Sequence, residues 1–260
     1  KREMPEVSFT TASDCEVPLH LYKRDGIDFL KSLRGMYALA IHDPASRRLV
    51  LSRDPFGIKQ LYYAEGPFGF AFASEPQALI ASGLVTADVR PNAATELLQL
   101  QFTTGAETVL SGIFRVLPGE TLIVESGRVA RRIRQPALPQ GAPEPIDEQA
   151  AMERIERALT DSVMVHQRSD VPYGMFLSGG VDSSAVLALM ARLNDRPVKA
   201  FTVGFSDTGA VDEREAAKAI AAALGADHVQ IDFDESDFWT TVPKVARAMD
   251  DPVADYAELP

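Results

Sequence analysis

Cysteine is almost absent from the 260-residue chain: Cys15 is the only one, so no disulfide can form within the chain. Disulfides belong to oxidising compartments, so their exclusion favours the cytoplasm. Long apolar runs are missing too, because no uninterrupted stretch approaches the roughly 20 residues that a helix needs to cross a bilayer. We therefore expect a soluble, cytoplasmic protein with no membrane partner.

Positive charge is scarce relative to negative charge. The chain has 26 Lys and Arg against 37 Asp and Glu, a formal net charge of −11. Nucleic-acid surfaces depend on Lys and Arg that neutralise phosphates, so we expect no nucleic-acid partner. The histidines lie far apart without cysteines at ligand spacing, which argues against zinc and makes each a surface or packing residue: His20, His42, His166 and His228.

The most informative segment is a loop rich in glycine and serine, Leu177–Ser184 (Leu-Ser-Gly-Gly-Val-Asp-Ser-Ser). It follows the apolar run 173–177 and precedes the Ala- and Leu-rich stretch 185–193, which predicts a buried strand, a loop and a helix. Gly179 and Gly180 allow backbone conformations closed to other residues and let an anion approach the main chain. The first amides of a helix favour phosphates, and three serine hydroxyls add donors. The loop therefore predicts a phosphate site.

Asp182 distinguishes this loop from Walker-type loops, which have a Lys beside the Ser or Thr at the helix start. An acid beside a phosphate implies a cation, so we interpret Asp182 as a Mg²⁺ ligand that shares the metal with phosphate oxygens. The alternative is a tight turn in which Asp182 caps its own helix.

A proline-rich stretch divides the chain. Residues 135–146 contain four prolines and read as a semi-rigid linker between residues 1–134 and 147–260. The first part has short strand patterns separated by turn signals, typical of an α+β domain with antiparallel sheet. The second alternates helices at 148–166, 185–193, 213–224 and 237–249 with strands at 173–177, 198–203 and 228–233. This rhythm predicts a doubly wound α/β domain, with helices on both faces of a parallel sheet.

Ligands of such sheets bind at the carboxyl ends of the strands, where the loop lies. If the next strand is a neighbour, Val203 at its end would flank a nucleotide. Ordinary strand core is an equal alternative for Val203. We interpret Arg53 and Asp54 as scaffold at a turn, for example as an ion pair.

The loop resembles the pyrophosphate-binding loop of N-type ATP pyrophosphatases. The first part resembles, in order, the glutaminase domain of glutamine-dependent asparagine synthetases, and the blocks that carry the resemblance are Ser13–Val17, Leu33–Ala40, Arg53–Lys59, Leu61–Tyr63 and Ala73–Glu75. Leu117–Glu120 and Ser169–Gly174 continue it up to the loop. The resemblance thus covers nearly the whole chain.

This resemblance implies a class II glutaminase domain, Ntn-hydrolase-like, at 1–134 and an ATP-pyrophosphatase domain at 147–260. In the family, an amino-terminal Cys releases ammonia from glutamine, and ATP activates aspartate as β-aspartyl-AMP with release of pyrophosphate and then AMP. The implied ligands are glutamine, ATP, Mg²⁺ and aspartate or a related acid. By position, Asp14 matches the acid that binds the α-ammonium of glutamine, and the ATP-binding positions are Leu177, Ser178, Gly179, Gly180, Asp182, Ser183, Ser184 and Val203.

Asp14 also has a structural alternative. Ser13 with Glu16 three residues later resembles a capping box, so Asp14 could merely favour a helix start.

The chain departs from the family pattern at both ends. It starts at Lys1, without the family's Cys-Gly-Ile start, so we assign no glutaminase nucleophile and interpret Cys15 as a packing residue. It stops at Pro260, just after an acidic segment, 250–255, that resembles the one beside the family's acceptor site. We therefore expect a chain truncated at both ends that could not complete the reaction alone.

Three alternatives stay open. A specialised relative could amidate another acid, a β-lactam-synthetase-like enzyme could cyclise its substrate, and a non-catalytic scaffold could retain a worn nucleotide fold. A homodimer is compatible with the sequence but not indicated by it.

Overall fold

The computed structural model describes residues 4–205 and 212–253. They form two compact units: the first runs to Gly141 and includes residues 249–253, and the second runs from Ala142 to Ala248. The division at Gly141 falls inside the proline-rich stretch 135–146. No helix among the described residues is long and apolar enough to cross a membrane.

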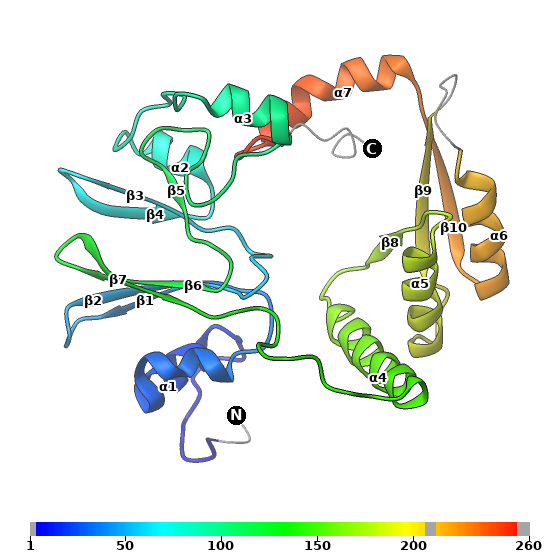
Figure 1. Cartoon of the computed structure of the whole chain (residues 1–260), viewed down its shortest axis with the longest axis horizontal. Coiled ribbons are helices and arrows are strands. Elements are labelled where there is room, and N and C mark those ends of the chain that lie inside the picture. Colours follow the sequence, from blue (N-terminus) through cyan, green and yellow to red (C-terminus); the bar gives the residue numbers. More distant parts are fainter. Residues whose placement is uncertain (1–3, 206–211, 254–260) are drawn as a thin grey trace. The chain divides into compact units, whose positions relative to one another are not determined.

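Two antiparallel sheets build the first unit (Figure 1). One has the order β1-β2-β6-β7 and consists of Ala38–Asp43, Arg48–Arg53, Glu120–Glu125 and Arg128–Arg134. The other has the order β4-β3-β5 and consists of Gly69–Ala73, Tyr62–Gly66 and Phe114–Arg115. Leu51 of β2 and Leu122 of β6 are paired neighbours in the first sheet, and both pack with Tyr63 of β3 in one core. The two sheets therefore face each other.

Helices cover the outer faces of this pair of sheets. Helix α1 (Glu16–Asp25) and the 3₁₀ helix η1 (Gly26–Ser32) pack Leu21 and Phe29 against Val50 of β2. Helix α2 (Pro76–Ala81) packs Leu79 against Tyr62 of β3. Helix α3 spans Ala93–Leu100. The order of layers is therefore helix, sheet, sheet, helix, which confirms the predicted antiparallel α+β class.

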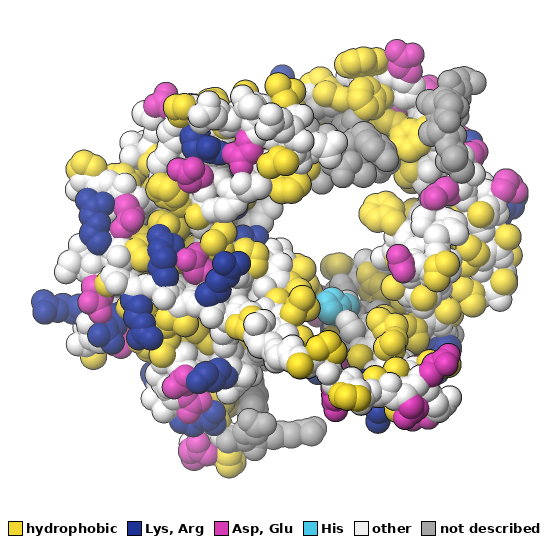
Figure 2. All heavy atoms as spheres, viewed as in Figure 1, with side chains coloured by type: hydrophobic (Ala, Val, Ile, Leu, Met, Phe, Trp, Pro, Cys, Tyr) yellow, Lys and Arg dark blue, Asp and Glu magenta, His cyan; other side chains and the backbone are white. Residues whose placement is uncertain are grey.

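Strand β7 lies at an edge of its sheet and carries four arginines in seven residues. Lys and Arg side chains gather over the strands of the first unit in Figure 2. Charged side chains on an edge strand oppose pairing with a second sheet. The acidic chain thus has a locally basic strand whose charge has a structural explanation.

The second unit contains a parallel sheet in the order β10-β9-β8. Its elements in chain order are α4 (Glu148–His166), β8 (Gly174–Phe176), α5 (Val181–Leu193), β9 (Lys199–Phe205), α6 (Arg214–Leu224), β10 (Asp227–Phe233) and α7 (Glu235–Ala248). The alternation of strands and helices was predicted correctly. Helix α5, however, begins four residues before the predicted start, so the second half of the glycine-serine loop forms its first turn.

Double winding is not seen among the described residues. The strand order follows the chain, and right-handed crossovers then place α5 and α6 on the same face of the sheet. Leu187 of α5 and Ala217 of α6 accordingly share a core with Ala200 of β9. Phe176 and Ile231, on the opposite face by the alternation of the strands, are exposed.

Candidate functional site

The glycine-serine loop connects the end of β8 to the start of α5. Leu177 continues the sheet pairing by donating its amide to the carbonyl of Phe201, at 2.8 Å. Helix α5 begins at Val181. The first turn of α6 lies beside the loop, since a Cβ added to Gly179 would lie 3.0 Å from Cβ of Ala216. The loop therefore stands at the carboxyl end of a parallel strand, between two helix N-termini.

Three serine hydroxyls hold the loop closed. Oγ of Ser178 and Oγ of Ser183 are 2.8 Å apart, and Ser184 donates its hydroxyl to the carbonyl of Gly180 at 2.7 Å. The amide of Gly180 donates to Oγ of Ser178 at 3.2 Å. The loop itself uses these hydroxyls in this conformation, and their predicted role as phosphate donors stays a prediction.

Backbone amides supply the donors instead. Within the described part of the chain, none of the amides of Gly179, Val181, Asp182 and Ser183 has a hydrogen-bond acceptor. The last three belong to the first turn of α5, where the positive end of the helix dipole lies. Gly179 and Gly180 are exposed, so an anion can reach the main chain. This arrangement can bind phosphate oxygens.

The two glycines do not have the conformation predicted for them. Gly180 has φ −80°, and neither Gly179 nor Gly180 has a positive φ. Limited space accounts for glycine at these two positions. A Cβ on Gly179 would lie close to the side chain of Ala216, and a Cβ on Gly180 would lie 3.2 Å from Oγ of Ser178. Their value lies in close approach to the backbone, not in unusual dihedral angles.

Asp182 is exposed in the first turn of α5. The N-cap position is Gly180 and has no side-chain cap, so the capping alternative for Asp182 is not seen. No described group bonds to its carboxylate, and no cluster of three or more potential metal ligands exists among the described residues. Mg²⁺ typically takes one or two carboxylates plus substrate phosphates, so a single free carboxylate beside a phosphate site fits that ion.

Leu177 is a core residue. Its side chain is 2% exposed and packs with Leu187, and its carbonyl accepts the hydroxyl of Thr202 at 2.7 Å. The side chain of Leu177 thus belongs to the core, and its predicted contact with a nucleotide stays a prediction.

The hydroxyl of Thr202 also lies 2.8 Å from Nε2 of His228. Because the single hydroxyl proton goes to the carbonyl of Leu177, His228 must donate from Nε2. The two residues hold the strand end before the loop. Sequence reasoning missed both, since His228 read as a surface or packing residue and a Thr in a strand gives no signal.

The prediction for Val203 required that its strand be the neighbour of the strand before the loop. Val203 lies on β9, and β9 pairs with β8, so this requirement is met. Its side chain is half-buried on the face opposite Ala200.

Gly204 next to Val203 has no room for a Cβ, because the side chain of Arg214 lies across it. Arg214 forms ion pairs with Asp232 and Asp212 and lowers the pKa of Asp212 to about 2.

Asp14 lines a cavity of about 910 Å³ in the first unit, together with Tyr37, Lys59, Ser74 and Glu75. The predicted side-chain cap is not formed: the N-cap of α1 is Cys15, without a side-chain cap. Asp14 accepts the amide of Val17 at 3.1 Å, but through its backbone carbonyl and not through its carboxylate. Glu16 instead binds the amides of Thr10 and Thr11, at 2.9 and 2.8 Å, and these bonds hold its pKa well below the usual range.

The thiol of Cys15 also lies beside this cavity. Cys15 is exposed, lines the cavity and donates to the carboxylate of Asp14 at 3.7 Å. Its predicted role as a packing residue is therefore wrong.

Arg53 and Asp54 form scaffold, as predicted, but bind the backbone rather than each other. Asp54 is 1% exposed and accepts the amides of Phe56, Ile58 and Lys59, at 3.2, 3.0 and 2.9 Å. Arg53 donates to the carbonyls of Lys59, Val116 and Gly57. The two side chains thus fix the turn that carries Lys59 to the cavity.

Comparisons with known proteins match both parts of the chain. Residues 1–134 match the family described as "Glutamine amidotransferase domain", and residues 154–260 match the family described as "Asparagine synthase". A Mycobacterium tuberculosis protein named "Putative asparagine synthetase" is 38% identical, with 97% of this chain and 39% of that protein covered. Glutamine-hydrolyzing asparagine synthetase 1 of Bacillus subtilis is 33% identical over the same shares. The chain thus spans 39% of the length of these relatives.

Two other likenesses are more distant. Amidase chyE of Penicillium rubens is 31% identical, with 88% of this chain and 36% of that protein covered. Among solved structures, the B. subtilis glutamine phosphoribosylpyrophosphate amidotransferase covers 88% of this chain and 41% of its own, at 19% identity and a TM-score of 0.37. That score is too low to support an argument. On the family matches, the chain belongs to the glutamine-dependent asparagine synthetase family, with its glutamine amidotransferase domain in residues 1–134 and its asparagine synthase domain in residues 154–260.

Proposed function

We propose that the protein that carries this chain makes asparagine from aspartate, with nitrogen from glutamine and energy from ATP, and that ATP is cleaved to AMP and pyrophosphate. The observation that carries this proposal is the start of α5, where unbonded amides and the free carboxylate of Asp182 lie together within a chain of this family. Amides and a helix N-terminus suit a polyanion, and the carboxylate suits its divalent cation.

The reaction needs activation because a carboxylate does not react with ammonia. In the first step, a carboxylate oxygen of aspartate attacks the α-phosphorus of ATP. The bond to the bridging oxygen breaks, and pyrophosphate leaves. In the second step, the nitrogen of ammonia attacks the acyl carbon, AMP leaves with the oxygen, and the nitrogen loses a proton. The first step builds negative charge on the departing pyrophosphate, which is where stabilisation is needed.

The loop residues supply that stabilisation. We propose that the amides of Gly179, Val181, Asp182 and Ser183 donate to pyrophosphate oxygens, and that Ser178 and Ser184 keep the loop in shape. Fixed donors of this kind act without reorganisation during the reaction. Mg²⁺ held by Asp182 would neutralise charge on the same oxygens. We keep Val203 as a candidate for the nucleotide side of the crevice.

Asp14 is proposed to bind glutamine. Its carboxylate faces a cavity and has no helix amide as a partner, so it can accept the α-ammonium group of an amino acid. Glutamine would supply the ammonia that the second unit consumes.

A second candidate is the amidation of another acid, and the likeness to an amidase, Amidase chyE, favours testing it. The test for both incubates the protein with Mg²⁺, ATP, glutamine and a panel of acids, and follows AMP, pyrophosphate and amide. The acid that yields equal amounts of AMP and amide is the acceptor. Formation of ADP instead of AMP would refute the proposed chemistry.

Asp182→Ala tests the loop itself. We expect the affinity for Mg²⁺-ATP to fall about tenfold or more, because a carboxylate ligand of the metal is lost. Asp195→Ala is the matched control, since Asp195 is an exposed acid just beyond the other end of α5. Calorimetry should show no change for the control. Equal affinity in the wild type and Asp182→Ala would count against the assignment.

A further inference from the structure

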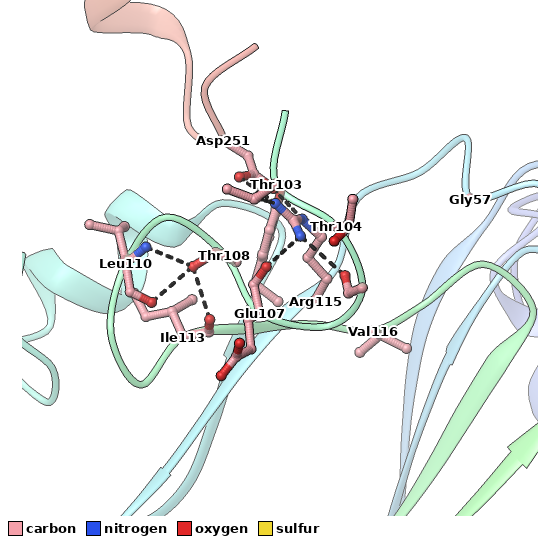
Figure 3. Close-up of polar contacts among 12 residues, drawn as sticks. Gly57, Thr103, Thr104, Glu107, Thr108, Leu110, Ile113, Arg115, Val116 and Asp251 are labelled. Atoms are coloured by element: carbon pink, nitrogen blue, oxygen red, sulfur yellow. Dashed lines mark hydrogen bonds and ion pairs between the residues drawn. The ribbon is translucent and has the colours of Figure 1, made fainter. Parts of the chain in front are cut away.

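After α7 the chain returns to the first unit, where residues 249–253 pack. Arg115 of β5 binds Asp251 there through both carboxylate oxygens: Nε donates to Oδ2, and Nη2 donates to Oδ1 at 2.7 Å. Figure 3 shows the guanidinium of Arg115 between Asp251 and the loop that leads into β5. The two residues are 136 positions apart in the chain. This bidentate pair is therefore a long-range tie.

All five N–H groups of Arg115 are used. Besides Asp251, Nη1 donates to the carbonyls of Gly105 and Glu107, at 3.1 and 2.6 Å, and Nη2 donates to the hydroxyl of Thr103. The planar guanidinium is suited to such a set, whereas Lys offers three donors from a single point. The neighbouring loop thus holds Arg115 in place before Asp251 binds.

The pair is largely shielded from water. The side chains of Arg115 and Asp251 are 14% and 13% exposed. The hydroxyl of Tyr62 donates to Oδ2 of Asp251 at 3.3 Å. Burial, and then the negative charge of Asp251, raise the pKa of Tyr62 far above its usual value, so the phenol stays protonated and remains a donor. Breaking such a pair leaves a buried charge without a partner, which makes the tie specific.

We propose that Arg115 is a positioning residue that anchors the segment 249–253 to the glutaminase unit and so couples glutamine hydrolysis to amide synthesis. The catalytic part of this inference rests on the proposed function. Asp251 lies within the asparagine synthase match in sequence, but packs in the first unit. The segment follows α7, and α7 begins directly after the carboxyl end of β10. The phosphate loop follows the carboxyl end of β8, two strands away in the same parallel sheet. Loss of the anchor would therefore release α7 and the segment after it, which lead away from the carboxyl ends of these strands.

The anchor itself is tested by hydrogen exchange on the intact protein. In Arg115→Ala, the amides of residues 249–253 should exchange about tenfold faster or more. Asp251→Asn is the milder variant, because Arg115 keeps its bonds to Gly105, Glu107 and Thr103. Arg48→Ala is the matched control, since Arg48 forms an exposed ion pair with Glu125 on the same unit. Exchange in 249–253 at the wild-type rate in both Arg115→Ala and Asp251→Asn would overturn the anchor.

The coupling is tested by the amount of amide formed per glutamate released. We expect this ratio to fall about threefold or more in Arg115→Ala and Asp251→Asn, while synthesis from added ammonia is retained. Loss of stability alone would lower all rates together and leave the ratio unchanged, which would overturn the coupling. If the wild type forms no AMP from ATP and glutamine, the proposed function fails, whereas the exchange experiment still decides whether Arg115 is the anchor.

Discussion

Asp54 gives the sharpest test of how the first unit is built. Its carboxylate is buried and accepts three backbone amides of the turn that follows it, those of Phe56, Ile58 and Lys59. Asp54→Ala leaves all three amides without their acceptor. Each buried amide left without its acceptor costs about 1–3 kcal/mol, so three of them together cost about 3–9 kcal/mol. Phe56 is exposed, so water can replace part of the loss, and we expect the lower end of that range.

Asp54→Asn should cost less. Oδ1 accepts from Phe56 and Ile58 and can stay an acceptor, while the new NH₂ group replaces Oδ2 and faces the amide of Lys59. One lost bond between buried groups corresponds to about 1–3 kcal/mol. The expected order of unfolding free energies is therefore wild type, Asn, Ala. Lys59 lines the cavity beside Asp14, so the KM for glutamine should rise in the same order.

The assay must report on the first unit. The chain has a single tryptophan, Trp239, and it lies in α7 of the second unit, so tryptophan fluorescence would miss the transition. Hydrogen exchange of β2 and β3 in a denaturant series is suitable. Asp28→Ala is the control, because Asp28 forms an exposed pair with Lys31 and should change the unfolding free energy by less than about 1 kcal/mol. Equal stabilities of Asp54→Ala and Asp28→Ala would refute the reasoning.

Three further predictions follow from single contacts. Asp14→Asn should raise the KM for glutamine about tenfold while synthesis from ammonia is unchanged, and a parallel loss of both would exclude Asp14 from glutamine binding. Thr202→Val should weaken Mg²⁺-ATP binding and Thr202→Ser should restore it, as measured by calorimetry, because the hydroxyl holds the strand end before the loop. Bonds from Thr104 and then Arg90 lower the pKa of Glu96 from 4.5 to about 2. Ionised Glu96 therefore stabilises the fold fully above pH 4.5 and progressively less as the pH falls toward 2. Glu96→Gln should lose less stability than the wild type over this pH range. Identical pH profiles of the melting temperature for the two proteins would contradict this.

The sequence predicted the elements of the second unit better than their arrangement. Strands and helices there have local signatures, in apolar runs and in helix composition, and these were found at nearly their true bounds. The order of the strands in the sheet depends on how the connecting helices cross it, and no local sequence pattern indicates that order. The same reason explains why β5 was missed: Phe114–Arg115 is a strand only because it pairs with Tyr62 and Tyr63, which lie far away in sequence.

Neighbouring charges misled the interpretation of Arg53 and Asp54. Adjacent opposite charges suggest an ion pair, but a single partner would leave most of the donors and acceptors of a buried side chain unused. The turn and the strands offer peptide groups in larger number, so each side chain binds three of them. Burial, which the sequence does not state directly, decides between the two outcomes.

The two glycines of the glycine-serine loop show how a sequence prediction can rest on two reasons of which the structure supports only one. Gly179 and Gly180 were predicted for two reasons, unusual dihedral angles and the close approach of an anion to the main chain, and neither glycine has a positive φ. A Cβ on Gly179 would lie only 3.0 Å from Cβ of Ala216 in α6, which is a tight contact. The bare backbone therefore does two things: it lets the first turns of α5 and α6 meet, and it leaves the amides at the start of α5 open to an anion. A larger residue at position 179 would disturb both, so we expect it to impair phosphate binding even though position 179 has no positive φ.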